Sequence, residues 1–143
     1  MKLISWNVNG IRSIHRKGAL TPVLEKMKPD IVCLQETKAE RYQSEVDLPD
    51  YEEYWNSSTT RKGYAGTAIF TKEKPLSISL GFPEKILKKY KLADGYGDPN
   101  AEGRVITAEH KDFLRRFERR AHAGGPRQSK TKRRRAWVYQ RGT

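Results

Sequence analysis

Residues 1–10, MKLISWNVNG, and residues 29–38, PDIVCLQETK, follow one pattern: an apolar run of strand-forming residues that ends in polar side chains. The first run predicts a strand over residues 2–6, and the second predicts a strand over residues 30–34. Both predicted strands are apolar on both faces, which is typical of a sheet that is covered by helices. A helix is therefore expected between them.

Residues 20–28, LTPVLEKMK, predict this helix. Thr21 is a suitable N-terminal cap, Pro22 suits the first turn, and Pro29 ends the helix. A loop that enters a further helix is expected before it, over residues 7–18. The order of strand, helix and strand indicates an α/β fold in which helices cover a sheet.

Three more strands are expected further along the chain. Residues 63–74, GYAGTAIFTKEK, predict the first, and residues 76–82, LSISLGF, alternate with a period of two and should pair with it. Residues 102–110, EGRVITAEH, predict the third. The charged residues 37–55 are expected to form helix and loop, and residues 83–101 a loop with one helical turn at EKILKKYK.

The formal net charge of +12 is unevenly distributed along the chain. Residues 1–110 carry 17 Lys and Arg against 15 Asp and Glu, whereas residues 111–143 carry 12 against 2. A strongly basic protein suggests a nucleic-acid partner, but here the basic character belongs mainly to the last quarter of the chain. That segment has to be interpreted before the charge can be used to infer a partner.

The composition also limits the class of protein. Cys33 is the single cysteine, which excludes a disulfide framework, and its place in an apolar run indicates a buried, inert thiol. No apolar stretch approaches the roughly 20 residues that a membrane span requires, and the N-terminus lacks the apolar segment of a signal peptide. We therefore expect a soluble, cytoplasmic monomer that does not contact a membrane.

Polar side chains follow the first two predicted strands where each ends: Asn7 after the first and Glu36 after the second. Because the carboxyl ends of neighbouring strands are a usual place for chemistry in α/β folds, an amide oxygen and a carboxylate there can share Mg²⁺, which prefers oxygen ligands. In an alternative interpretation, Asn7 and Asn9 only shape a turn. Glu36 then pairs with Lys38 or Arg12, and spacing alone favours this alternative.

Four segments, in the order in which they occur, carry a resemblance to a known family: LISWNVNGIR, PDIVCLQETK, YAGTAIFTK and EGRVITAEH. They resemble the exodeoxyribonuclease III family of abasic-site endonucleases, within the endonuclease/exonuclease/phosphatase superfamily. The stretch at residues 29–38 is similar to the whole first signature of that family. The resemblance covers residues 1 to about 113, with a departure at residues 84–101, where the loop is longer than usual.

The resemblance implies a fold and an activity. The fold is the N-terminal half of a four-layer α/β sandwich, in which two mixed sheets are flanked by helices. The activity is hydrolysis of DNA phosphodiesters at abasic sites and 3′ ends in base excision repair, with Mg²⁺ or Mn²⁺ as cofactor and DNA as partner. A phosphoesterase of small molecules or lipids from the same superfamily is an alternative that the wording of QETK and YAGTAIFTK disfavours.

The resemblance also implies roles for individual residues. Asn7 and Glu36 stand at positions that hold the metal, and Asn9 stands where relatives can carry an acidic residue near the metal. The residues implied to lie beside DNA belong to one loop and to the mouth of the site: Tyr64, Ala65, Gly66 and Arg12.

Three later motifs of the family are absent from the sequence: a Tyr in an Asn-x-Tyr-x-Pro-Asn-like segment, a Gly-Asp-x-Asn motif and a terminal Ser-Asp-His. The sequence also lacks any Asp-His pair that could orient an attacking water molecule. The resemblance therefore implies a truncated and inactive relative of these enzymes.

The character of the sequence changes at Lys111. Residues 111–143 contain few aliphatic residues and many arginines, so we expect that they do not continue the sheet. A partial domain is thus predicted over residues 1–113, followed by a basic, disordered or frameshifted tail over residues 114–143. Arginine runs arise when valine codons are read out of register, which favours a frameshift. If the tail is genuine, the chain is instead a non-catalytic fragment that binds nucleic acid through the tail.

Overall fold

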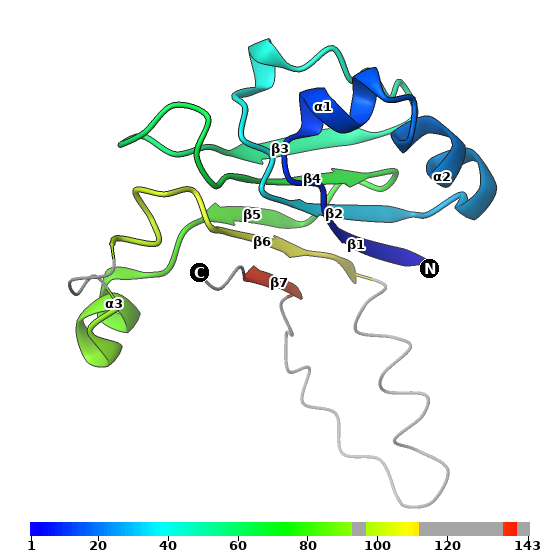
Figure 1. The fold of residues 1–143 in the computed structure, drawn as a ribbon. Helices are drawn as coiled ribbons and strands as arrows, with labels where there is room; N and C mark the ends of the chain where they lie inside the picture. Colours follow the sequence, from blue (N-terminus) through cyan, green and yellow to red (C-terminus); the bar gives the residue numbers. More distant parts are fainter. Residues whose placement is uncertain (93–96, 112–135, 140–143) are drawn as a thin grey trace, which may run out of the picture.

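The computed structural model of this chain describes residues 1–92, 97–111 and 136–139, which form two sheets and several short helices (Figure 1). The first sheet has the strand order β1-β2-β4-β3, and the second has the order β5-β6-β7. The strands are β1 (Leu3–Asn7), β2 (Ile31–Gln35), β3 (Glu52–Asn56), β4 (Thr67–Thr71), β5 (Ser77–Leu80), β6 (Val105–Glu109) and β7 (Ala136–Tyr139). The helices are α1 (Ile11–Arg16), α2 (Leu20–Met27), α3 (Glu84–Tyr90) and a short 3₁₀ helix, η1 (Arg41–Gln43).

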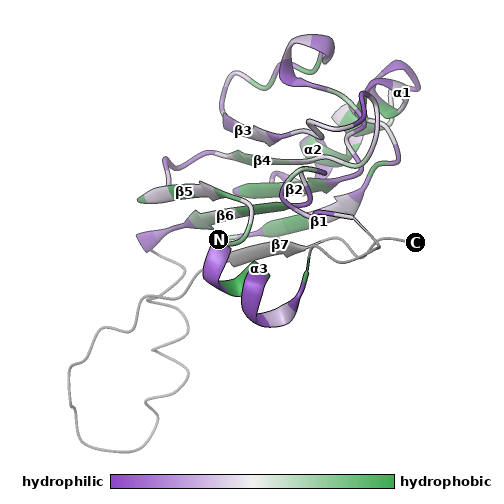
Figure 2. Cartoon of the chain, turned by 90° about the vertical axis from the view of Figure 1, so that its left-hand side faces the viewer, coloured by the Kyte–Doolittle hydropathy of each residue, from purple (hydrophilic) through white to green (hydrophobic). Residues whose placement is uncertain are grey.

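The sequence of β2 explains why these elements form layers. Val32 and Leu34 belong to an apolar cluster shared with α1 and α2, whereas Ile31 and Cys33 belong to a second cluster shared with β6. Because successive side chains of a strand point to opposite faces, a run that is apolar throughout needs a partner layer on each side. Helices therefore cover one face of the first sheet, and the second sheet covers the other (Figure 1). In Figure 2, much of β2 and β6 is coloured as hydrophobic, and side chains of these two strands form the cluster between the sheets.

The predicted strand, helix and strand at the start of the chain are confirmed as β1, α2 and β2. β1 and β2 are parallel, whereas β2 and β3 pair antiparallel with β4, so the first sheet is mixed as expected. Two details of the prediction are wrong. α2 begins at Leu20 after Ala19, so Thr21 lies inside the first turn instead of capping it. β1 is not buried on both faces, because burial alternates along the strand and Leu3, on the exposed face, is 41% exposed.

The predicted pairing of residues 76–82 with residues 63–74 is also wrong. β5, which comes from the first of these segments, pairs antiparallel with β6 in the second sheet. The reason is that both edges of β4 are already occupied, one by β2 and the other by β3. The segment between β4 and β5 therefore carries the chain from the first sheet to the second.

β3 begins at Glu52, near the end of residues 37–55, for which the sequence predicts helix and loop. Charged residues are depleted in strands, so Glu52 and Glu53 hide the strand pattern. The position at the sheet edge leaves room for both, and Arg41 pairs with Glu53 at 2.6 Å. The helical part of the prediction is reduced to the single turn of η1.

β7 contradicts the expectation that residues 111–143 do not continue the sheet. Residues 136–139 pair antiparallel with β6, with Val105 opposite Tyr139 and Ala108 opposite Ala136. The sequence AWVY at these positions is strand-forming, and β6 has an edge to fill on the side away from β5. The rest of the expectation for the tail concerns residues 112–135 and 140–143, which lie outside the described residues.

The helices differ in how they contribute to the core. α2 buries Leu20 and Leu24, and Ile11 at the start of α1 is fully buried in the same cluster. α3 confirms the predicted helical turn near residues 84–91 but has no buried residue. Within the described segments, no helix has the length and apolar character needed to cross a bilayer.

Candidate functional site

The parallel pairing of β1 and β2 brings the polar ends of the two strands together. Asn7 ends β1 opposite Gln35, and Glu36 follows directly after β2. Nδ2 of Asn7 donates a hydrogen bond of 2.9 Å to Oε1 of Glu36. The prediction that Asn7 and Glu36 lie close together at the ends of adjacent strands is confirmed, whereas their role as metal ligands stays a prediction.

Lys38 and Asn9 complete this arrangement. Nζ of Lys38 lies 3.1 Å from Oε2 of Glu36 and donates a hydrogen bond of 2.5 Å to Oδ1 of Asn9. The backbone N–H of Asn9 donates to Oδ1 of Asn7 at 3.0 Å. We call Asn7, Asn9, Glu36 and Lys38 the strand-end cluster. The alternative of a turn at the asparagines with an ion pair between Glu36 and Lys38 therefore describes part of the same geometry.

The hydrogen bonds of the cluster keep Glu36 ionised. The Asn7 amide contributes most and the Lys38 ammonium next, and together they hold the pKa of the Glu36 carboxyl below its usual value. Burial acts in the opposite direction, and the positive charge of Arg104 adds to the lowering. Since 26% of the Glu36 side chain is exposed, this carboxylate is both charged and accessible to a cation.

Backbone hydrogen bonds join the three loops that carry the cluster. Gly10 donates to the carbonyl of Glu36 at 2.7 Å, and Lys38 donates to the carbonyl of Ala65 at 2.9 Å. Most of the non-glycine residues with positive φ in the described residues lie in these loops, with φ between 45° and 51°: Asn9, Glu36, Lys38 and Ala65. Non-glycine residues rarely adopt this conformation, and such strain gathers at functional sites.

The loop that the resemblance places beside DNA forms one wall of the cluster. Ala65 is only 4% exposed, so it contributes its backbone carbonyl more than its side chain. Gly66 has a φ of +86°, and a Cβ atom there would lie 2.5 Å from Oγ1 of Thr37. Position 66 therefore has to be glycine for the loop to approach the end of β2 this closely.

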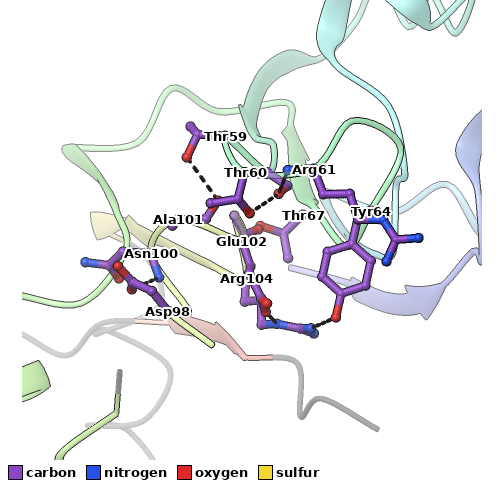
Figure 3. A network of polar contacts seen from close by, with 12 residues as sticks. Thr59, Thr60, Arg61, Tyr64, Thr67, Asp98, Asn100, Ala101, Glu102 and Arg104 are labelled. Carbon is purple, nitrogen blue, oxygen red and sulfur yellow. Dashed lines mark hydrogen bonds and ion pairs between the residues drawn. The ribbon is translucent and has the colours of Figure 1, made fainter. Parts of the chain in front are cut away.

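A second group of polar side chains connects the loop before β4 to the start of β6 (Figure 3). Nη2 of Arg104 donates a hydrogen bond of 3.0 Å to Oη of Tyr64, and Nε of Arg104 pairs with the carboxylate of Glu102. The guanidinium groups of Arg61 and Arg104 lie 5.4 and 5.5 Å from the centre of the Tyr64 ring. Tyr64 is thus held in place by two cations.

Arg104 belongs to the predicted strand segment EGRVITAEH, and its residue type and position predict no functional role. In the structure it is 8% exposed and its charge acts on Glu36. The sequence contains a sign of this burial, because Arg104 directly precedes a strongly apolar strand. An arginine in such a place is buried only when it is paired with an opposite charge. The paired carboxylate, Glu102, stands two positions earlier in the same segment.

A groove of about 600 Å³ opens beside the strand-end cluster. Its basic lining comes from α1 and from the cluster itself: Arg12, His15, Arg16 and Lys38. Nη2 of Arg12 donates to the carbonyl of Lys38 at 3.5 Å, so this implied DNA-contacting residue borders the cluster. One carboxylate, Glu45, also lines the groove, but cations outnumber it. A mainly basic groove attracts ligands of negative charge, such as phosphate groups.

The strand-end cluster offers oxygen atoms that suit a hard divalent cation. Oε2 of Glu36 and Oδ1 of Asn9 converge on one positive group, the ammonium of Lys38. Mg²⁺ takes oxygen ligands, often with one or two carboxylates, and completes its shell with water and substrate phosphate. Among the side chains that the structure describes, no group of three or more His, Cys, Asp and Glu could hold a metal alone. The cluster therefore fits one edge of a Mg²⁺ or Mn²⁺ shell.

The chain matches proteins of known family and structure. The family model for the endonuclease/exonuclease/phosphatase family matches residues 4–142. An exodeoxyribonuclease of Bacillus subtilis is 42% identical over 114 residues, which cover 80% of this chain and 40% of that protein. The DNA repair nuclease APEX1 of Danio rerio is 39% identical over 118 residues, which cover 80% of this chain and 34% of that protein.

Solved structures show the same fold. The catalytic domain of Xenopus laevis APE2 has a TM-score of 0.60 and 29% identity over 77% of this chain and 39% of that one. An AP endonuclease from Archaeoglobus fulgidus has a TM-score of 0.54 and 31% identity over 78% of this chain and 37% of that one. The chain thus spans at most about 40% of each of these proteins. The resemblance carried by the four sequence segments is confirmed, and the chain belongs to the endonuclease/exonuclease/phosphatase family.

Proposed function

We propose that this chain carries one edge of the active site of a divalent-metal-dependent DNA phosphodiester hydrolase, which acts on abasic sites and 3′ ends in base excision repair. The observation that carries the proposal is the contact between Asn7 and Glu36 at the ends of the parallel strands β1 and β2. The names of similar proteins support the substrate class, since they include an exodeoxyribonuclease and a DNA-(apurinic or apyrimidinic site) endonuclease.

In this proposal the strand-end cluster holds Mg²⁺ or Mn²⁺. Glu36 supplies the carboxylate and Asn9 supplies an amide oxygen. Asn7, which the resemblance implies as a ligand, is instead assigned to orient Glu36, because its Nδ2 donates to Oε1 of Glu36 and its Oδ1 accepts the backbone N–H of Asn9. When bound, the metal neutralises the charge of the scissile phosphate. The lowered pKa of Glu36 keeps the carboxylate ready to bind a cation at neutral pH.

The groove beside the cluster holds the DNA backbone. Arg12 and Arg16 of α1 line the groove, and arginine contacts to phosphates position DNA without reading the base sequence. Tyr64, held between Arg61 and Arg104, presents its ring and hydroxyl from the opposite loop. Gly66 and Ala65 act through the backbone, which brings Tyr64 close to the cluster.

The same proposal includes a low rate of cleavage. The sequence has three histidines, and none of them follows an aspartate, so an Asp-His pair that could position the attacking water is absent from the sequence. Loss of a general base costs about 10² to 10⁴ in rate. Loss of an electrostatic donor to the reacting group costs a further ~10² to 10³. We therefore expect far slower incision than in relatives that possess the later motifs of the family.

A non-catalytic function in nucleic-acid binding is the second candidate. It is favoured by one observation, the 12 Lys and Arg against 2 Asp and Glu in residues 111–143. Each phosphate that such side chains neutralise releases counterions, so the affinity for DNA should fall steeply with salt concentration.

The test of the first candidate is single-turnover incision of an abasic-site duplex, with the chain in excess and Mg²⁺ present. We expect slow incision that Glu36→Ala removes and that Glu25→Ala, on the exposed side of α2, does not change. Incision that survives Glu36→Ala would contradict the proposed site. Fast incision that Glu36→Ala removes would support the site and overturn the inference of a low rate.

The second candidate is tested by the salt dependence of DNA binding. Replacing Arg133, Arg134 and Arg135 by serine removes three positive charges and leaves residues 136–139 unchanged. If the basic segment contacts phosphates, the affinity of this variant should depend less steeply on salt than that of the wild type. Equal salt dependence in the wild type and in this variant would show that the basic segment does not contact DNA phosphates.

A further inference from the structure

The ammonium group of Lys38 contacts Glu36 and Asn9, the two residues that the proposed function assigns to the metal. We propose that the ammonium group of Lys38 occupies the cation position of the strand-end cluster, so that a divalent ion binds Glu36 only when Lys38 moves away. The inference rests on the proposed metal-dependent function and adds a residue that controls access to the metal site. Lys38 is then a positioning residue and not a metal ligand.

The hydrogen bonds of the cluster show which group a metal ion has to replace. Oε2 of Glu36 lies 3.1 Å from Nζ of Lys38, and Oδ1 of Asn9 accepts a 2.5 Å hydrogen bond from the same ammonium. Oδ1 of Asn7 accepts the backbone N–H of Asn9 at 3.0 Å, which turns the Nδ2 of Asn7 toward Oε1 of Glu36. An ion that binds Oε2 of Glu36 together with Oδ1 of Asn9 therefore takes the place of the ammonium.

An ammonium and a divalent ion cannot share these oxygens. Both would lie within a few ångströms of Oε2, and like charges repel strongly at that separation. Glu36 is the single carboxylate of the cluster, because position 9 is an asparagine. One ammonium therefore neutralises the cluster completely, and a divalent ion regains the attraction of Glu36 only after Lys38 has left.

The Lys38 side chain has a place to move to. Its backbone is fixed by the hydrogen bond to the carbonyl of Ala65, but 37% of its side chain is exposed and it also lines the basic groove. The flexible stem of a lysine allows the ammonium to turn from Glu36 into that groove. In the groove the Lys38 ammonium would lie near Arg12 and Arg16, and a bound DNA phosphate would attract all three cations. DNA binding should therefore favour metal binding.

The direct test measures Mn²⁺ affinity of the full chain by electron paramagnetic resonance, in which free and bound Mn²⁺ are distinguished without any activity assay. Lys38→Met removes the charge and keeps much of the stem, so we expect about tenfold tighter Mn²⁺ binding. Lys38→Arg keeps the charge and should not bind more tightly than the wild type. Lys26→Met, on the exposed side of α2, is the matched control and should leave the affinity unchanged.

The gain in affinity is informative because damage to the fold produces a loss. Unchanged or weaker Mn²⁺ binding in a folded Lys38→Met variant would overturn the inference while leaving the metal site intact. The double variant Glu36→Gln/Lys38→Met should lose the added affinity. If the wild type and Lys38→Met both fail to bind Mn²⁺ in a Glu36-dependent way, the proposed metal function fails, and the role of Lys38 fails with it.

A second measurement uses the unmodified chain and does not depend on the folding of any variant. Acetylation of lysine side chains can be followed residue by residue by mass spectrometry, with and without Mn²⁺. We expect Mn²⁺ to increase the acetylation rate of Lys38 severalfold relative to Lys26, because the ammonium is released from Glu36 and Asn9. An unchanged Lys38 rate under conditions where Mn²⁺ is bound would show that the ion binds without displacing Lys38.

Discussion

The two ends of the first sheet both carry charged side chains, yet they differ in how these side chains are arranged. At the carboxyl ends of β1 and β2, the members of the strand-end cluster bond to one another around a single cation. At the opposite end, a cavity of about 260 Å³ is lined by Asp30, Lys72, Glu73 and His110. There His110 is 4% exposed, and its Nε2 has no hydrogen-bond partner among the described residues.

The charges at the opposite end mainly support the fold. Oδ2 of Asp30 accepts a 2.5 Å hydrogen bond from the backbone N–H of Lys2, and this contact is the main cause of the lowered pKa of Asp30. The carboxylate thus fixes the start of β1 beside β2. The number of charges therefore does not locate a site. The strand-end cluster is distinguished by oxygen atoms that converge on one cation and by loops with positive φ.

The largest expected effect concerns the close packing of the loops at the cluster. Gly66→Ala places a Cβ atom 2.5 Å from Oγ1 of Thr37 at a φ of +86°. We expect it to lower the free energy of unfolding by about 3 kcal/mol, because an unfavourable backbone conformation adds to a steric overlap. Urea denaturation followed by circular dichroism measures the change.

Gly18→Ala is the matched control for this prediction. Gly18 also has a positive φ, +64°, but a Cβ atom there would meet nothing within 4 Å. The loss should be limited to about 1 kcal/mol from the backbone alone. If both variants lower the free energy of unfolding by the same amount, the close contact between position 66 and Thr37 adds no cost, and the loops at the cluster are less tightly packed than the structure indicates.

Much of the layered fold could be predicted from the sequence. The run IVCL at residues 31–34 is apolar on both faces of the strand, so it requires cover on both sides, and β2 has it. The proximity of Asn7 and Glu36 follows from the same reasoning, since parallel neighbouring strands end at the same edge of a sheet. The cover on both faces of β2 and the proximity of Asn7 and Glu36 could be predicted because they depend only on the local residue pattern and on the geometry of parallel strands.

Other features depend on distant partners, which a local pattern does not reveal. The alternation in residues 76–82 correctly indicates a strand, but its partner is β6 because β2 and β3 already occupy both edges of β4. The contact of Arg104 with Tyr64 links residues 40 positions apart. The positive φ of Glu36 has no signal in its residue type, because it results from hydrogen bonds between loops.

The next effect compares carboxylates at the two ends of the sheet. Glu36→Ala should weaken Mn²⁺ binding by about 100-fold, because it removes the single carboxylate of the cluster. Glu73→Ala, at the opposite end, should leave Mn²⁺ binding unchanged although it also removes an exposed carboxylate. Mn²⁺ titration by electron paramagnetic resonance measures both. Equal losses in the two variants would mean that Mn²⁺ responds to the overall charge of the chain and not to the cluster.

A smaller effect is expected from the ion pair that supports Tyr64. Glu102→Gln leaves Arg104, which is 8% exposed, without its charged partner, and should cost about 2 kcal/mol of unfolding free energy. Glu84→Gln removes an ion pair of 2.6 Å between Glu84 and Lys88, whose side chains are 77% and 76% exposed. That change should cost less than about 0.5 kcal/mol. Urea denaturation of the two variants side by side measures whether burial decides the cost.

The smallest expected effect is a pH dependence of stability that originates at the opposite end of the sheet. Burial lowers the pKa of His110 below its usual value of 6.5, and the negative charge of Glu73 opposes this shift only in part. As the pH falls below about 6.5, the unfolded chain binds a proton at this position before the native chain does. The stability contributed by neutral His110 is therefore complete above pH 6.5 and is lost progressively below it.

His110→Gln should remove this part of the pH dependence, because an amide does not titrate. The measurement is the free energy of unfolding at several values between pH 7.5 and 5, for the wild type and for this variant. Glu73→Gln removes the opposing charge, so it should extend the loss to lower pH and make the total loss larger. His15→Gln, in the groove at the cluster end, controls for the removal of an imidazole elsewhere. Parallel pH profiles for the wild type and His110→Gln would show that His110 has the same proton affinity in the folded and the unfolded chain. They would also remove the contrast between the bonded side chains of the strand-end cluster and the buried His110 at the other end.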